Sequence, residues 1–278
     1  MLELFSYGFM RTALLVAVFI GIAAALIGQT VVLRRQANIG DALAHSALAG
    51  VALGVVLGFD PTIWSLIATL VAAFALELVR RLFPRYAEVA SAIIIAASVG
   101  IAGILSNMAG TGKSFSSYLF GSIVAISPSD RNLSIIVSII VIIINILLYK
   151  ELFYMNFDLK GARLAGINVN LVDTIVIIMT ALTVGIASRI VGTLVISSLL
   201  VLPYATAMQL HFNYKKTMIS AIIIGVFDTF FGVVFSYELG LAPGGTIVLL
   251  AVIILILAAI GNKLYFYFNK QKLLKEKQ

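Results

Sequence analysis

Long apolar runs separated by short polar segments are the main pattern of this chain. An apolar run of more than about 18 residues is long enough for a helix that crosses a membrane. The pattern predicts nine spans, at about 9–33, 38–58, 62–82, 88–108, 133–152, 171–187, 191–210, 217–237 and 246–264. The sixth and seventh runs meet at a tight turn, and the number falls to eight if they form a pair of half-spans. We therefore expect an all-α, polytopic membrane protein.

Two segments between the spans predict shorter helices. Residues 115–126 are apolar but too short to cross a bilayer in the usual way, so we expect an outer or re-entrant helix there. Residues 153–170 form the longest polar stretch, in which 160–164 can be a short helix that stops at Gly166. Pro61 is well placed to begin the third span, and Pro203 should kink the seventh. The isoleucine-rich fifth span is expected to face lipid.

Basic residues between the spans predict the topology. Arg34 and Arg35 follow the first span, and further basic residues follow the third and seventh spans and fill the tail. Lysine and arginine gather on the cytoplasmic side of membrane proteins, so the N-terminus should lie outside and the C-terminus inside. The net charge of +7 is thus a topology signal and does not predict nucleic-acid binding. We expect a transmembrane domain over 1–265 and a basic, mobile cytoplasmic tail over 266–278.

Composition supports the same class of protein. The chain is 62% hydrophobic and 11% charged, whereas soluble domains carry roughly 25% charged residues. Its 278 residues leave no room for a separate soluble ATPase domain. The chain has no cysteine, which excludes disulfides and thiolate metal sites. Residues 1–7 lack a basic n-region, so no cleavable signal peptide is expected.

Asp41 and His45 are the main candidates for chemistry. They lie four residues apart near the start of the second span, so a helix would place them on one face. Ionisable groups within membrane spans are costly and often functional. A carboxylate oxygen and an imidazole nitrogen suit Zn²⁺ or Mn²⁺. Two ligands make a weak site, which a second copy of the chain would double; the alternative is an acid near a helix end beside a hydrogen-bonded histidine.

Other polar residues give weaker signals. Asp228 lies inside the eighth span, where it could pair with Arg189 or serve a transport path. His211 lies at the end of the seventh span, where an interfacial polar residue is common. Residues 110–114 look like the end of a phosphate-binding loop, but Asn107 stands where the motif needs glycine and no strand precedes it. Nucleotide binding by this chain is therefore not expected.

The chain resembles the membrane permeases of metal-importing ABC transporters, the zinc and manganese group. The resemblance covers nearly the whole chain. Five segments carry it in the family's order: 33–52, 118–123, 157–167, 191–203 and 241–248. Residues 157–167 and 241–250 look closer to the zinc branch, so zinc is favoured over manganese.

The resemblance implies a permease subunit, with no enzymatic activity of its own, in a bacterial plasma membrane. It implies a homodimer, a pair of cytoplasmic ATPases, an extracellular metal-binding protein and no tightly bound cofactor. It also implies that Asp41 and His45 line the path of the transported metal. The ATPase would dock on the loop that contains Phe157, Asp158, Gly161, Ala162, Arg163, Ala165 and Gly166. Gly161 would add flexibility there.

Three alternatives are less consistent with the sequence. An ion-coupled secondary carrier would show more acids within the spans and symmetric broken helices. An intramembrane enzyme would need a nucleophile with its base, or a full set of metal ligands, in one chain. A structural scaffold would leave the polar loop and the Asp41–His45 pair unexplained.

Overall fold

The computed structural model describes residues 7–83, 87–109, 115–123, 126–188, 191–193 and 195–275, and within them it contains twelve α-helices and no β-strand. These are α1 (Gly8–Leu33), α2 (Ala37–Leu57), α3 (Pro61–Leu82), α4 (Ala87–Ala109), α5 (Phe115–Phe120), α6 (Pro128–Leu147), α7 (Tyr149–Phe157), α8 (Leu159–Leu164), α9 (Val169–Ala187), α10 (Ile196–Met208), α11 (Tyr214–Leu239) and α12 (Pro243–Lys275). The all-α prediction is confirmed.

Among the described residues, eight helices are long and apolar enough to cross a membrane: α1, α2, α3, α4, α6, α9, α11 and α12. The seventh expected span, 191–210, is wrong in its extent. Of the residues described in this range, only those of α10 are helical, and with 13 residues it is shorter than the eight long helices. Hydropathy does not report this difference, because the residues before Ile196 are apolar too. Pro203 lies inside α10 as expected.

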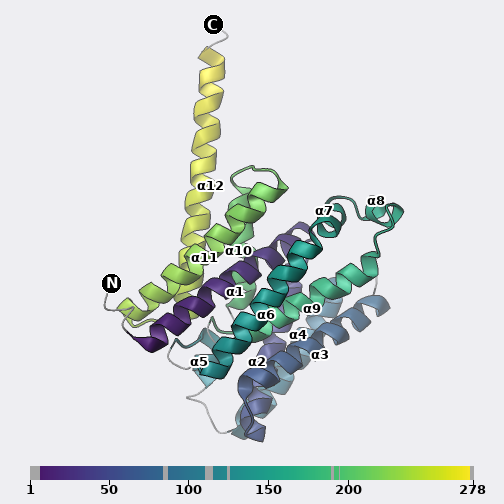
Figure 1. Cartoon of the computed structure of the whole chain (residues 1–278), viewed down its shortest axis with the longest axis vertical. Coiled ribbons are helices and arrows are strands. Elements are labelled where there is room, and N and C mark those ends of the chain that lie inside the picture. Colours follow the sequence, from purple (N-terminus) through teal and green to yellow (C-terminus); the bar gives the residue numbers. More distant parts are fainter. Residues whose placement is uncertain are drawn as a thin grey trace.

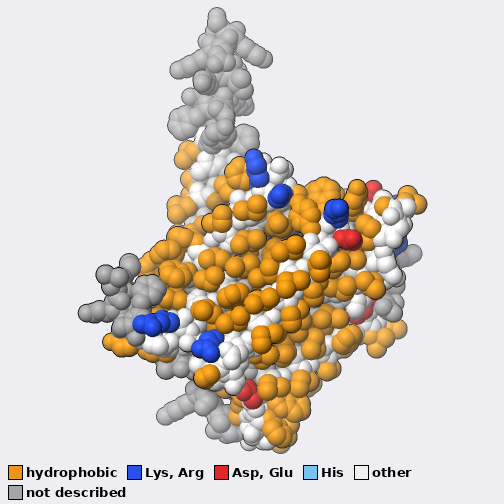
Figure 2. All heavy atoms as spheres, viewed as in Figure 1, with side chains coloured by type: hydrophobic (Ala, Val, Ile, Leu, Met, Phe, Trp, Pro, Cys, Tyr) orange, Lys and Arg blue, Asp and Glu red, His pale blue; other side chains and the backbone are white. Residues whose placement is uncertain are grey.

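The long helices run side by side through one bundle (Figure 1). α5 and α8 lie at opposite ends of it, and α12 projects beyond the other helices at its C-terminal end. Hydrophobic side chains cover most of the face in Figure 2, whereas most of the visible charged side chains lie near its margins. This distribution is the one expected for a surface in contact with lipid tails.

α6 shows how a local signal and burial together define a span. It begins at Pro128, earlier than expected, because Ser127 and Asp130 form a capping box at its start. Its buried face carries Ser134, Ser138 and Asn145, while many of its isoleucines point outward and are exposed. Such an arrangement suits a helix whose outer face contacts lipid, as the sequence predicted.

The segment after α6 contains more helix than the sequence indicated. Residues 149–157 form α7, which we had divided between a span and a loop. Its aromatic residues Tyr149, Phe153 and Phe157 each lie with ring centroids 5.0–5.7 Å from that of Tyr214, at the start of α11. These aromatic contacts explain why a helix forms here. α8 matches the expected short helix, and α5 is shorter than the predicted 115–126.

α12 continues to Lys275, beyond the expected boundary at residue 265. The first ten residues of the expected tail, 266–275, are therefore helical in this structure. The division into a domain over 1–265 and a tail over 266–278 stays a prediction.

Candidate metal-binding site

The helix that carries Asp41 and His45 begins directly after a tight corner. Arg35 there has a positive φ of 54°, and the backbone N–H of Gln36 donates to the carbonyl of Val31 at 2.8 Å. The chain thus reverses within three residues and enters α2 at Ala37. Asp41 lies in the second turn of α2, near the end joined to the two arginines.

Asp41 and His45 lie on the open face of α2. Asp41 is exposed, and His45 and Leu48, on the same stripe, are half-buried. The remaining faces of α2 pack against other helices. A Cβ on Gly40 would lie 3.2 Å from Leu200 of α10, and one on Gly54 would lie 2.9 Å from Pro61 of α3. The structure therefore brings the two predicted ligands to one surface of a single chain and leaves that surface uncovered.

One chain supplies only part of a metal site at this position. In the part of the chain that the structure describes, no three His, Asp or Glu side chains come together in a group that could hold a metal ion. Asp41 and His45 offer one carboxylate and one imidazole. The arrangement can contribute two ligands, and a stable coordination shell needs more from elsewhere.

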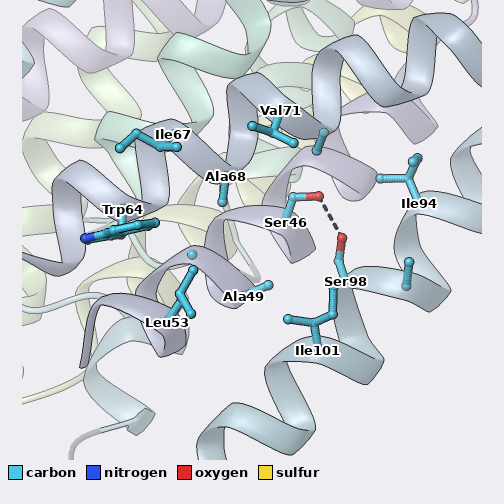
Figure 3. Close-up of a pocket in the computed structure, with 13 residues that line it drawn as sticks. Ser46, Ala49, Leu53, Trp64, Ile67, Ala68, Val71, Ile94, Ser98 and Ile101 are labelled. Atoms are coloured by element: carbon cyan, nitrogen blue, oxygen red, sulfur yellow. Dashed lines mark hydrogen bonds between the residues drawn. The ribbon is translucent and has the colours of Figure 1, made fainter. Parts of the chain in front are cut away.

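An apolar cavity lies on a different side of α2 and does not suit a metal ion. It has a volume of about 330 Å³ and lies between α2, α3 and α4 (Figure 3). Its lining is apolar apart from Ser46 and Ser98, whose hydroxyl oxygens are 2.8 Å apart. Each hydroxyl already has the other as a hydrogen-bond partner. A hydrophobic space of this kind gives a cation no ligands, so it is not a route for an ion.

The remaining candidates lie apart from this site. The ring Nε2 of His211 lies 2.9 Å from the side-chain amide of Asn262, and His211 has a positive φ of 53° at the turn after α10. Asp228 is fully buried in α11, and among the described residues neither of its carboxyl oxygens has a hydrogen-bond partner. Arg189, the partner expected for Asp228, lies outside the described residues. The loop 110–114 also lies outside them.

α8 has well-defined ends that follow from its sequence. The side chain of Asp158 accepts hydrogen bonds from the N–H groups of Lys160 and Gly161 and so caps the N-terminus. At the other end Gly166 has a φ of 83°, and the N–H of Ile167 donates to the carbonyl of Ala162 at 3.1 Å, as in a Schellman motif. The expected stop at Gly166 is confirmed.

Gly161 has a structural role that differs from the flexibility we expected. A Cβ at this position would overlap the carboxylate of Asp158. Glycine leaves room for the carboxylate of the capping side chain over the first turn of α8, and any Cβ would require that carboxylate to shift. The residue supports a fixed geometry of the helix.

The residues of the expected docking loop divide into a supporting and an exposed set. Ala162 is fully buried and anchors α8. Phe157 is 64% exposed and Leu164 is 90% exposed. Leu164 was not among the residues expected to dock, although a large apolar residue in the last turn of a short helix in a polar loop is a signal of such a role. Large exposed apolar side chains at one tip mark a surface that a partner can cover.

The sequence of this chain is similar to those of known transport proteins. The model of the ABC 3 transport family matches residues 6–262. The chain is 36% identical over 251 residues to a probable metal transport system membrane protein of Treponema pallidum, covering 90% of this chain and 94% of that protein. It is 30% identical over 270 residues to the manganese transport system membrane protein MntC of Listeria innocua, covering 97% and 96%.

Solved structures show the same fold. The structure of PsaBC from Streptococcus pneumoniae in complex with Fab matches with a TM-score of 0.81 and 27% identity, and the match covers 91% of each chain. An inward-facing putative metal-chelate type ABC transporter matches with a TM-score of 0.73 at 15% identity, over 91% of this chain and 86% of that one. The family model spans nearly the whole chain, and this chain therefore belongs to the ABC 3 transport family.

Proposed function

We propose that the chain is the permease subunit of an ABC importer that moves a divalent metal ion across the bacterial plasma membrane. The observation that carries the proposal is the open face of α2, on which Asp41 is exposed and His45 half-buried. Membership of a transport family and relatives named for metal or manganese transport support it. Separate cytoplasmic subunits would hydrolyse ATP, and an extracellular binding protein would deliver the metal to the permease.

The proposed metal path lies between two copies of the chain. A second copy that covers the open face of α2 would bring two carboxylates and two imidazoles together. Four such ligands can hold a divalent cation transiently. A transport site must also release its ion, so a site that is completed only by contact between copies is chemically suitable.

The identity of the metal is the finer part of the proposal. The sequence resemblance favoured zinc, whereas several relatives are named for manganese transport. Oxygen and nitrogen ligands of this kind serve both ions. The proposed cargo is therefore a divalent transition-metal ion, and zinc and manganese are the two ions to compare.

The proposed mechanism is alternating access. Closure of the two ATPases would move the loop around α8, and this movement would be passed to the helices that carry Asp41 and His45. The path would then open to the outside while the binding protein is docked. We propose that the N-terminus lies outside and the C-terminus in the cytoplasm, in agreement with the basic residues at the ends of the spans. With eight long helices, this topology requires the short helix α10 to make a ninth crossing.

Metal uptake by cells that lack the native chain tests this proposal. Asp41→Asn and His45→Gln, made separately, each remove one ligand type and keep the side chain's size. Loss of an outer-shell partner alone weakens metal sites by about tenfold or more, so loss of a ligand should reduce uptake of radioactive zinc or manganese at least as much. The two ions are supplied separately and in competition.

Glu88→Gln and His211→Gln serve as matched controls. They make the same chemical changes at an exposed acid and at the other histidine. Both should retain uptake at the parental rate. Parental uptake by the combined Asp41→Asn and His45→Gln variant would refute the site assignment.

A further inference from the structure

An ion pair joins two parts of the bundle that are 139 residues apart in the chain. Arg34 follows the last turn of α1, and Asp173 lies in the second turn of α9. Both terminal nitrogens of Arg34 donate to the carboxylate of Asp173, with Nη2 to Oδ2 at 3.1 Å. The side chains are only 11% and 20% exposed. A bidentate pair that is shielded from water fixes both the distance and the relative direction of the elements it joins.

The buried positive charge of Arg34 needs a negative partner, and Asp173 supplies it. Burial, and then the positive charge of Arg80 on α3, lower the pKa of the Arg34 guanidinium. A guanidinium nevertheless stays protonated in proteins, and a buried charge without a partner is strongly unfavourable. Asp173 balances this charge, so α1 and α9 are held together where α3 adds a repelling group.

The Asp173 side of the pair is connected to α8 through backbone and capping hydrogen bonds. The N–H of Ile167 donates to Ala162 of α8, and the N–H of Val169 donates to Ile167. The side chain of Asn168 then caps α9 by accepting from the N–H of Leu171. Hydrogen bonds thus run without a break from α8 into the first turn of α9. A displacement of α8 carries Asp173 with it.

The Arg34 side is connected in the same way to α2. The N–H of Arg34 donates to Thr30 at 3.0 Å, and that of Gln36 donates to Val31 at 2.8 Å. Both bonds hold the corner to α1, and the N–H of Ile39, in the first turn of α2, donates to the carbonyl of Gln36 at 3.0 Å. A displacement of Arg34 therefore moves the start of α2, which carries Asp41 in its second turn.

We propose that the ion pair between Arg34 and Asp173 transmits movement of α8 to the helix that carries Asp41 and His45. The proposal rests on the transport function proposed above and makes Arg34 and Asp173 positioning residues for it. Packed apolar helices can slide past one another by small amounts. The bidentate pair prevents this sliding between α9 and the α1–α2 corner, so that the N-terminal end of α2 moves together with α8.

The first test measures transport and ATP hydrolysis together, in the full transporter reconstituted with its ATPase and binding protein. Arg34→Gln and Asp173→Asn should each reduce the metal moved per ATP by about tenfold, within the range usual for coupling between sites, while ATP hydrolysis continues. Exchanging the charges, Arg34→Asp with Asp173→Arg, should restore most of the loss. Arg35→Gln, at the exposed neighbour, is the control and should behave like the parent. Unchanged metal per ATP in the single variants would overturn the proposal.

A second variant separates coupling from folding. Replacing both partners by apolar residues, Arg34→Met with Asp173→Leu, removes the buried charges together and is usually well tolerated. If the pair only stabilises the fold, this variant transports metal like the parent, which would also overturn the proposal. If the pair transmits movement, the variant assembles and hydrolyses ATP but moves little metal.

A spectroscopic measurement distinguishes failure of this proposal from failure of the proposed function. The chain contains no cysteine, so spin labels can be attached through Leu57→Cys in α2 and Ile256→Cys in α12, both about half exposed. ATP should change the distance between the labels in the parent and not in the apolar double variant. If ATP changes the distance in the parent only, but the parent imports neither zinc nor manganese, the proposed cargo is refuted and the role of the ion pair stands. An equal change of distance in both chains would refute the role of the ion pair.

Discussion

Gly161 shows how one missing side chain fixes the shape of the proposed docking helix. Its Cα lies beneath the carboxylate of Asp158, which accepts hydrogen bonds from two backbone N–H groups at 2.9 and 3.0 Å. Any Cβ at residue 161 would displace that carboxylate. The present position of the capping carboxylate therefore depends on the glycine, and the cap supports the short helix that ends at Leu164.

We predict that Gly161→Ala loosens α8 and weakens the contact with the ATPase. Loss of an N-cap costs about 1 kcal/mol, so the backbone amides of α8 should exchange hydrogen several-fold faster. Hydrogen exchange measured by mass spectrometry checks this. Gly245→Ala is the matched control, because a Cβ there meets nothing within 4 Å. Equal exchange in the two variants would contradict the role of Gly161.

At the scale of elements, close approach between helices depends on small residues of α1. Gly21 contacts Gly225 and Thr229 of α11, and Gly28 lies against the backbone of Leu200 in α10. α10 has only 13 residues and contains a proline, so its own backbone hydrogen bonds hold it less firmly than those of a long helix. Its position depends on this contact with α1.

Gly28→Ala should therefore be among the most damaging small changes in the chain. The added Cβ would overlap the carbonyl oxygen of Leu200, and backbone atoms in a packed bundle cannot move aside as a flexible side chain can. Overpacking of this kind costs up to about 3 kcal/mol. Thermal unfolding in detergent should show a lower midpoint than in the parent, whereas Gly8→Ala should be neutral because nothing lies within 4 Å of its Cβ. A parental midpoint for Gly28→Ala would show that α1 and α10 separate easily.

At the scale of the whole molecule, the bundle has an apolar flank and two polar ends. The side chains near one end include Phe157 and Leu164, which are exposed although they are apolar. A flank that faces lipid can be apolar throughout, whereas large exposed apolar side chains close together at a tip beyond the spans mark a surface that a protein partner can cover. This contrast supports the assignment of α8 to the contact with the ATPase.

Leu164→Glu tests that assignment directly. The change places a charge in the centre of the proposed contact, and loss of such an anchor should reduce the ATPase that co-purifies with the chain by about tenfold or more. The fold should be unaffected, because Leu164 is 90% exposed. Leu210→Glu, at a 43% exposed position after α10, is the control and should keep the ATPase bound. If the Leu164→Glu variant retains the ATPase fully, the docking surface does not include Leu164 and the assignment of α8 is wrong.

Much of the architecture could be predicted because the hydropathy of consecutive residues is enough to identify a membrane span. The bounds of α1, α2, α3, α4 and α9 were predicted within about two residues, the uncertainty usual for helix ends. α7 was missed and the length of α10 was overestimated, each for a physical reason. The first is held by aromatic contacts with Tyr214, far away in the chain, and the second lies in an apolar run that hydropathy cannot divide.

The candidate site divides in the same way. Spacing alone puts Asp41 and His45 on one face of a helix, because residues four apart lie on the same side. The sequence by itself thus determined the class of protein, most of the spans, and the placement of the candidate ligands Asp41 and His45 on one face of α2. Only the tertiary structure decided that this face is left uncovered, that Gly161 serves the cap of α8, and that Arg34 meets Asp173. Each of these depends on which distant segments pack together, and that is a property of the folded bundle and not of any local pattern.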